Sequence, residues 1–201
     1  MRHILPSASG ALVSCHLEKP LDDAVWSCFD ALQQRRPGGF DIVALVRPPD
    51  AAYGEDEERW LERARAVAAR GPFGLHTHWT SPTHARPTNG DTAGRVRAEV
   101  VWMRERGLEP RYFCGGGWYT DEAVQSAVRE LGLIDCTQRS GDPTADTLPT
   151  THSLGQLARA VLGPLPCYVH AYFHDYELLD APRRYALSAS LVVLGRRAAK
   201  I

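Results

Sequence analysis

The sequence predicts an α/β fold with a mostly parallel sheet, either open or closed into a distorted (β/α) barrel. Short apolar runs alternate with longer segments that repeat apolar residues at helical spacing, the pattern of strands joined by crossover helices. The chain has 201 residues, of which 44% are hydrophobic and 23% charged. This length and composition fit one globular domain over residues 1–201.

About seven apolar runs are expected to be parallel strands, because each is short and is bounded by glycine, proline or polar residues. The second run, for example, stops at Arg47-Pro48-Pro49-Asp50. The predicted strands cover residues 11–15, 40–46, 73–76, 111–114, 133–136, a short stretch near Leu148, and 167–173.

Six segments have helical periodicity and suitable ends. Acidic residues open the segment 55–70 and arginines follow, as the helix dipole favours, while Asp91 is the expected N-cap of a helix that stops before Gly107. Residues 138–147 are polar and predict a surface loop. The predicted helices cover residues 23–34, 55–70, 91–106, 120–131, 153–161 and 182–197.

Charge and cysteine usage argue against several classes of partner. The formal net charge is -1 and no long basic stripe occurs, so nucleic acid is not expected. No stretch is long enough to span a membrane, and Met1–Pro6 has no apolar run of a secretory signal. Five scattered cysteines predict a reduced, cytoplasmic chain. A small-molecule or glycan substrate is expected, and a homo-oligomer is left open.

Histidines gather at one predicted edge of the sheet. Strand carboxyl ends of such sheets lie on one side, where ligands bind. Seven of the eight histidines fall at or beyond these ends, on the last strand, or in the loops there: His16, His76, His78, His84, His152, His170 and His174.

The segment His76-Thr77-His78 is the strongest local signal for a metal. Residues two apart in an extended chain point the same way, so both imidazoles can aim at one point. Neutral imidazole suits zinc and related ions. The alternative is one hydrogen-bonded core histidine and one surface histidine.

His16 and Glu18 share a face at the end of the first strand. Glu18 can complete a His/His/carboxylate ligand set with water at the open position; alternatively it is a solvated loop residue. Asp22 and Asp23 are rival carboxylates, better suited to capping the helix that follows.

The last predicted strand has one polar face and one apolar face. Tyr168, His170, Tyr172 and His174 alternate along the polar face, which fits a strand beside a cleft. His174 can serve as a proton donor, or it can simply cap the end of the strand.

Three glycines, Gly115–Gly117, precede Trp118 and Tyr119. Glycines after a strand allow close backbone approach to a ligand, and the two aromatic side chains suggest a sugar-binding wall. Core packing of both is the alternative. The nucleotide-binding glycine motifs are absent, so nucleotide binding is not favoured.

These blocks, in this order, resemble the NodB homology domain of polysaccharide deacetylases, carbohydrate esterase family four. The segment from His76 to Pro82 resembles a divergent second motif of that family. Phe113–Trp118 together with Asp135-Cys136-Thr137 resembles the third, and residues 170–178 resemble the last. His16-Leu17-Glu18 lies where the acidic first motif is expected.

The resemblance implies a metal-dependent hydrolase that removes an acetyl group from an N- or O-acetylated sugar or related amide, with metal-bound water as nucleophile. His76 and His78 would be metal ligands, Glu18 the third ligand or the base, and His174 the acid, with zinc the preferred ion. His16, in the first acidic place, joins the catalytic candidates. The expected substrate-binding residues are Trp79, Gly116, Trp118, Tyr119, His170 and Tyr172.

Two departures from the family pattern define the competing hypotheses. His16 replaces an acidic residue, and Cys114 stands where the third motif has an arginine. They favour a catalytically inactive relative that binds metal or carbohydrate, whereas the histidine cluster favours the hydrolase. A metal-assisted isomerase or lyase is the third hypothesis, because a fold does not fix its chemistry.

Overall fold

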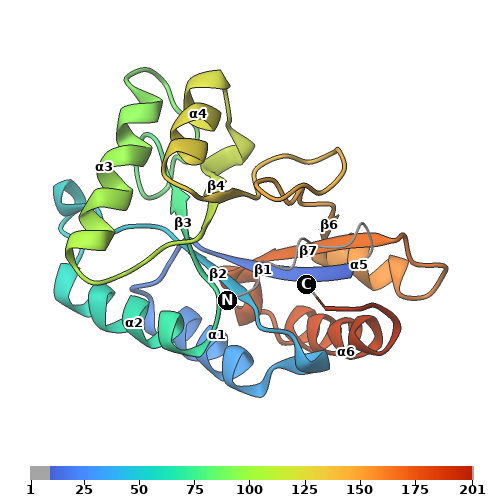
Figure 1. Cartoon of the computed structure of the whole chain (residues 1–201). Coiled ribbons are helices and arrows are strands. Elements are labelled where there is room, and N and C mark those ends of the chain that lie inside the picture. Colours follow the sequence, from blue (N-terminus) through green and yellow to red (C-terminus); the bar gives the residue numbers. More distant parts are fainter. Residues whose placement is uncertain (1–9, 201) are drawn as a thin grey trace.

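A computed structural model describes residues 10–200 and shows one curled, seven-stranded sheet in the order β5-β4-β3-β2-β1-β7-β6 (Figure 1). Every neighbouring pair of strands is parallel. The strands are β1 Gly10–Leu17, β2 Val43–Val46, β3 Phe73–Thr77, β4 Tyr112–Gly115, β5 Ile134–Asp135, β6 His152–Ser153 and β7 Tyr168–His174.

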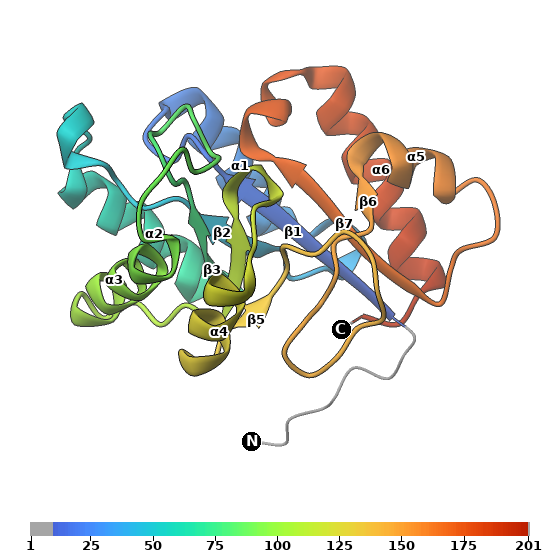
Figure 2. The same cartoon turned by 90° about the horizontal axis from the view of Figure 1, so that it is seen from above.

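Helices connect the strands and surround the outside of the sheet (Figure 2). An aspartate or serine side chain accepts a backbone N–H at the start of each α-helix, which satisfies a donor that the first helical turn leaves free. The helices are α1 Asp23–Arg35, α2 Glu57–Arg70, α3 Thr92–Glu105, α4 Glu122–Glu130, α5 Leu154–Ala160 and α6 Ala181–Arg197. Short 3₁₀ turns are η1 Pro37–Gly39, η2 Ala51–Tyr53, η3 Gly116–Trp118 and η4 Asp175–Leu179.

The two faces of the sheet have different surroundings. Alternate residues of β1, such as Val13 and Cys15, join the large apolar core that also contains buried helix residues. Leu12 belongs to a smaller apolar cluster with residues of β2 and β4, and Ser14 and His16 follow it at two-residue spacing. Because side chains alternate across a strand, the inner face becomes more polar toward the carboxyl edge.

The predicted fold is confirmed. Seven parallel strands form an incompletely closed, distorted (β/α) barrel, with the segment between β5 and β6 along its open side (Figure 1). Most strands and helices lie within a few residues of their predicted positions. The exposed stretch within residues 138–147 is the expected loop.

The strand predicted near Leu148 is reduced to an isolated parallel bridge between Thr147 and Asp135. The paired strand β6 lies later, at His152–Ser153, so His152 lies within a strand rather than beyond one. Leu148 instead donates its backbone N–H to the carbonyl oxygen of Asp135 at 2.8 Å and packs in the smaller apolar cluster that contains Leu12, called the inner cluster below. A lone leucine between polar residues and a proline does not distinguish a strand from a buried loop anchor.

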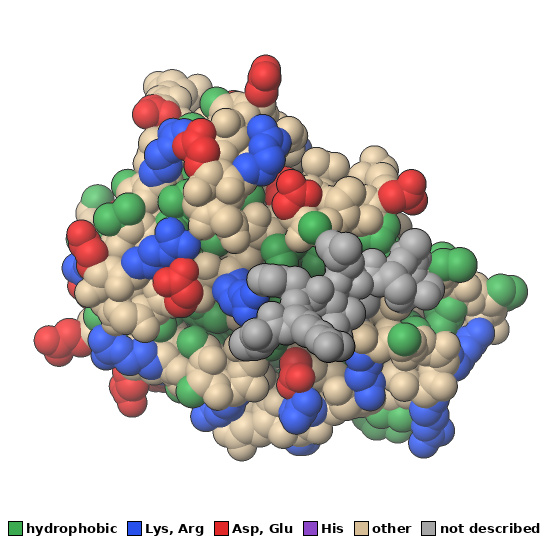
Figure 3. Space-filling view, viewed as in Figure 1, with side chains coloured by type: hydrophobic (Ala, Val, Ile, Leu, Met, Phe, Trp, Pro, Cys, Tyr) green, Lys and Arg blue, Asp and Glu red, His purple; other side chains and the backbone are tan. Residues whose placement is uncertain are grey.

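The surface facing the viewer in Figure 3 mixes positive and negative side chains. Within residues 10–200, no helix combines the length and apolar character that a membrane crossing requires. Met1–Pro6, the segment considered for a secretory signal, lies outside the described residues.

A candidate metal centre at the carboxyl edge of the sheet

Three parallel strands bring their polar ends together. His16 lies near the end of β1, His76 near the end of β3 and His174 at the end of β7, while Glu18 and His78 follow β1 and β3. The register sets His16 beside His174 on neighbouring strands. Carboxyl ends of parallel strands meet at one edge, which explains how residues more than 150 positions apart form one cluster.

Three imidazoles surround one carboxylate oxygen. The Oε1 atom of Glu18 lies 3.7 Å from Nε2 of His76, 3.8 Å from Nε2 of His78 and 3.6 Å from Nε2 of His174. The donor atoms of Glu18, His76 and His78 all lie within 4.8 Å of one another. Two imidazoles and a carboxylate are a common protein ligand set for a catalytic zinc ion.

Backbone hydrogen bonds orient the two candidate ligand histidines. Nδ1 of His76 lies 3.0 Å from the carbonyl oxygen of Cys114, and Nδ1 of His78 lies 3.0 Å from that of Pro82. A carbonyl only accepts, so each Nδ1 carries the proton and each Nε2 keeps its lone pair. Both Nε2 atoms are buried and have no hydrogen-bond partner among residues 10–200. This is the arrangement in which a backbone carbonyl orients a metal-binding imidazole.

Glu18 is ionised, and Arg47 anchors its backbone. Burial alone raises its pKa, but the surrounding imidazoles of His76, His78 and His174 outweigh burial and lower the pKa well below its usual range. Arg47 donates from Nε to the carbonyl oxygen of Glu18 at 3.0 Å. Arg47 also forms a bidentate ion pair with Glu55, at 2.7 and 2.5 Å. The arginine is therefore fixed in place and anchors the backbone at Glu18.

His16 lies at the centre of the aromatic side chains. Its ring centroid is 4.6 Å from that of His76, 5.1 Å from that of His174 and 5.2 Å from that of Trp118. The residue is buried, and its Nε2 has no hydrogen-bond partner in the part of the chain that the structure describes. Burial, followed by the neighbouring His76 and His174, lowers the pKa of His16 well below its usual value. The ring is therefore neutral at pH 7.

His174 is the more open imidazole of the cluster. Nδ1 lies 3.4 Å from Oε2 of Glu177, and the same oxygen accepts the backbone N–H of His174 at 2.8 Å. The ring stacks on Tyr176 at a centroid distance of 5.2 Å. Burial raises the pKa of Glu177, but hydrogen bonding to His174 outweighs it and lowers that pKa. A carboxylate thus orients His174 with Nε2 toward Glu18.

A small cavity of about 120 Å³ opens onto this cluster. His16, Glu18, His76 and His174 line it, together with Ala85, Gly115, Gly117 and Trp118. Typical ligand pockets measure about 300–1,000 Å³, so the cavity admits a small group rather than a whole sugar. A larger hollow of about 630 Å³ beside α6 is lined by no histidine.

An arginine joins the aromatic wall at the cavity. The guanidinium carbon of Arg139 lies 4.3 Å from the ring centroid of Trp118 and 4.8 Å from that of Tyr172. Its NH1 atom donates to the hydroxyl of Tyr172 at 2.9 Å. Trp118 and Tyr172 themselves meet edge to face at 4.8 Å. The wall is therefore built from Trp118 and Tyr172, with the positive charge of Arg139 against it, rather than from the predicted pair Trp118 and Tyr119.

Other expected substrate-binding residues lie away from the cavity lining. His170 is fully buried, with Nε2 2.8 Å from the hydroxyl of Ser14 and Nδ1 3.0 Å from the carbonyl oxygen of Leu148. Both ring nitrogens therefore bond within the barrel. The structure gives His170 a supporting place beneath the cluster, in contrast to the substrate contact expected from the sequence.

Trp79, Tyr119 and Gly116 also belong to the supporting structure. Trp79 is buried in the large core and meets Tyr119 edge to face at 5.4 Å. The Tyr119 hydroxyl donates to Asp121 at 2.6 Å. A Cβ on Gly116 would lie 2.5 Å from the carbonyl oxygen of Thr77, so this glycine allows the loop to pack closely. Its neighbours Gly115 and Gly117 line the cavity.

Several site residues were not predicted from the sequence. Arg47, Glu55, Glu177 and Arg139 hold or extend the cluster through the contacts given above. Only Glu177 carries a local signal, since it lies three residues after His174. The others act across the fold, where one sequence gives no indication of the pairing.

Comparison with solved structures identifies the class of fold. A family 4 carbohydrate esterase from Streptomyces lividans, in complex with acetate, superposes with a TM-score of 0.54 at 14% identity, over 94% of this chain and 86% of that one. The polysaccharide deacetylase Bc1974 from Bacillus cereus gives a TM-score of 0.56 at 11% identity, over 91% and 87%.

A CE4 family pseudoenzyme from Bacillus anthracis has the same architecture. It superposes with a TM-score of 0.60 at 9% identity, over 97% of this chain and 63% of that one. No family model and no curated protein matches the sequence. The chain therefore has the fold of the CE4 polysaccharide deacetylases, which confirms the fold implied by the sequence resemblance, and this fold accommodates both enzymes and a pseudoenzyme.

Proposed function

We propose that the chain is a metal-dependent hydrolase that removes an acetyl group from an N- or O-acetylated sugar or a related small amide. The observation that carries the proposal is the convergence of two buried, unpartnered Nε2 atoms, from His76 and His78, beside the Glu18 carboxylate. The deacetylase fold supports it independently.

Glu18, His76 and His78 fit a divalent metal ion and would hold it. The pKa of His76 is lowered, chiefly by burial. Its imidazole is therefore neutral and can bind a metal ion. Nitrogen and oxygen donors of this kind favour zinc among the common ions. When bound, such an ion polarises an acyl oxygen and makes water a stronger acid.

The remaining histidines divide the proton transfers. His16 is neutral, buried beside the cavity and free at Nε2, so it can take the proton of the attacking water. His174, oriented by Glu177, can give a proton to the leaving amine or alcohol. In this proposal an imidazole occupies the first acidic place of the family's first motif.

The cavity size and its aromatic wall suggest how a substrate binds. An acyl group fits the space of about 120 Å³ beside His16 and His174. The sugar ring would then lie outside, against Trp118 and Tyr172, where Arg139 is exposed. Single-domain organisation over residues 1–201 and a cytoplasmic location stay predictions of the sequence.

The test is release of acetate from acetylated amino sugars and acetylated sugars by the zinc-loaded chain. We expect acetate release by the parent and by His84→Gln, which removes an exposed imidazole, and none by His78→Ala. A chain that binds zinc through this site but releases no acetyl group from any of these substrates would contradict the hydrolase. It would support the alternative of an inactive deacetylase-like domain.

A further inference from the structure

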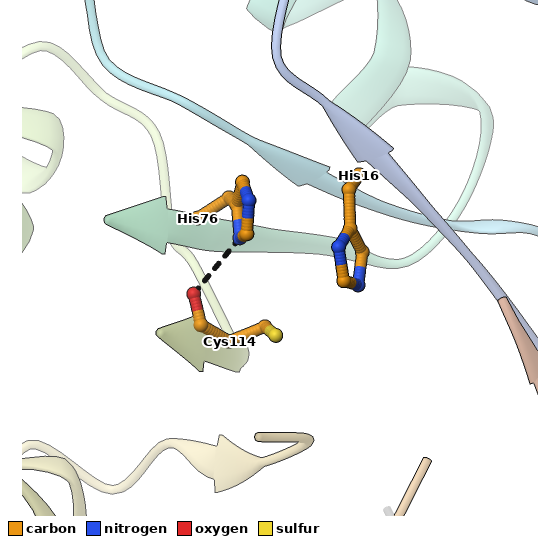
Figure 4. A group of neighbouring side chains, drawn as sticks. All are labelled: His16, His76 and Cys114. Atoms are coloured by element: carbon orange, nitrogen blue, oxygen red, sulfur yellow. Dashed lines mark hydrogen bonds between the residues drawn. The ribbon is translucent and has the colours of Figure 1, made fainter. Parts of the chain in front are cut away.

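A second group of metal-donor side chains lies beside the first and includes a thiol. His16 of β1, His76 of β3 and Cys114 of β4 offer donor atoms that all lie within 4.8 Å of one another (Figure 4). All three residues are buried, with exposed fractions of 2%, 2% and 0%. Parallel register places His76 directly beside Cys114 on the neighbouring strand.

The hydrogen bonds of these residues leave their metal-ligating atoms available. Nδ1 of His76 is committed to the carbonyl oxygen of Cys114 (Figure 4). Nε2 of His76 and Nε2 of His16 are buried, and neither has a hydrogen-bond partner among the described residues. The thiol of Cys114 makes a long contact, 3.8 Å, with the carbonyl oxygen of Gly115, and the side chain of Thr137 also lies beside it. Unpaired buried donors and acceptors are costly, so this grouping needs an explanation beyond packing.

We propose that His16, His76 and Cys114 form a second metal-binding position, which takes a soft, thiolate-preferring cation such as Cu⁺ or Cd²⁺. A thiolate selects soft ions, whereas the carboxylate of Glu18 favours harder ones. Because the donor atoms lie within 4.8 Å of one another, an ion at their centre lies at most about 2.8 Å from each, so the donors move inward by at most about 0.5 Å (sulfur) to 0.8 Å (nitrogen) to reach bonding distance.

The two metal positions exclude each other. Of the two ring nitrogens of His76, Nδ1 donates to the carbonyl oxygen of Cys114, which leaves Nε2 to bind a metal ion. The single lone pair of Nε2 is needed both by the group with Glu18 and His78 and by the group with His16 and Cys114. A soft ion held by His16 and Cys114 therefore withdraws His76 from Glu18 and His78. The inference goes beyond the proposed hydrolase and shares only His76 with its metal ligands and His16 with its base.

Binding is a simple exchange of a proton for the ion. The Cys114 thiol loses its proton to solvent as the sulfur–metal bond forms, and the two imidazoles contribute neutral nitrogens. No oxidant or reductant takes part. The cavity lined by His16 and His76 gives the ion a route to the group.

The test is titration of the metal-free chain with Cd²⁺, followed by the ultraviolet absorption of cadmium–thiolate charge transfer. Cys28 and Cys167 are replaced by serine throughout, because the thiol of Cys28 is only partly buried and that of Cys167 is exposed, so both could bind Cd²⁺ from solution. Cys136→Ser is the matched control for Cys114→Ser, since both cysteines are fully buried in the inner cluster. Thermal unfolding confirms that each variant is folded.

We expect the charge-transfer band in the parent, in Cys136→Ser and in His78→Gln, and its loss in Cys114→Ser. His16→Gln keeps the thiol and should bind Cd²⁺ at least about tenfold more weakly. A folded parent without the band, a band that survives in Cys114→Ser, or unchanged affinity in His16→Gln would overturn the site. His78→Gln separates the two proposals, because it should lose acetate release and keep the band.

Discussion

The burial of His170 predicts a specific loss of stability in acid. Burial, the largest influence, lowers the pKa of His170 from its ordinary 6.5 to about 4. Above pH 6.5 the ring is neutral in both the folded and the unfolded chain, so His170 causes no loss of unfolding free energy there. Below pH 6.5 the unfolded chain takes up a proton that the folded chain refuses, and stability falls until the pH reaches about 4.

The size of the effect follows from the difference in pKa. A gap of about 2.5 units corresponds to about 3 kcal/mol of unfolding free energy, lost between pH 6.5 and 4. His170→Gln removes this proton linkage. It also breaks the hydrogen bonds to Ser14 and Leu148, so the variant should be less stable than the parent at pH 7.5 and approach or pass it by pH 4.5.

The assay is urea unfolding of the chelator-treated chain at several pH values between 7.5 and 4.5. A chelator keeps metal release out of the comparison, because protonation of ligand histidines also expels metal. His84→Gln, which removes an exposed histidine, should follow the parent curve. Parallel curves for the parent and His170→Gln would refute the assignment of a buried, neutral His170.

Three further variants test other parts of the site, and a fourth serves as a control. His78→Ala should lose bound metal and activity together, measured by metal content and acetate release, whereas retained activity would remove the site as described. His174→Ala should keep the metal and lose about 10²–10⁴-fold in kcat; loss of metal as well would make it a ligand. Arg47→Met leaves Glu55 without its buried partner and should cost about 3 kcal/mol in unfolding free energy. Arg97→Met, which breaks an exposed pair, should cost less than about 1 kcal/mol, and equal losses would contradict the burial argument.

The fold and the first donor pair were predictable because they depend on short-range periodicity. Alternating apolar runs and helical segments specify a parallel sheet, and two-residue spacing puts His76 and His78 on one side. Glu18 needs one more step, the convergence of parallel strand ends. The structure brings all three within reach of one ion.

Depth along the barrel was beyond the sequence. His170 and His174 share a face of β7, yet four residues of strand separate them by about 13 Å. His174 lines the cavity and His170 lies buried beneath it. Periodicity identifies the face of a strand, whereas the position of the edge decides which residues meet a ligand.

Long-range pairings were also beyond the sequence. Arg139 stacks on Trp118 from a loop, and Arg47 reaches both Glu18 and Glu55. The departure at Cys114 has a different meaning in the structure than in the sequence. Its fully buried side chain lies beside His16 and His76, so arginine at this position would be forced into the barrel interior and should destabilise the fold.

The most direct test of the metal centre is the metal content of the untagged chain, purified without added metal, by mass spectrometry. About one equivalent of zinc or a related divalent ion in the parent and none in the His76→Ala/His78→Ala double variant would agree with the site built from Glu18, His76 and His78. No metal in the parent after reconstitution, or equal metal in the double variant, would contradict it.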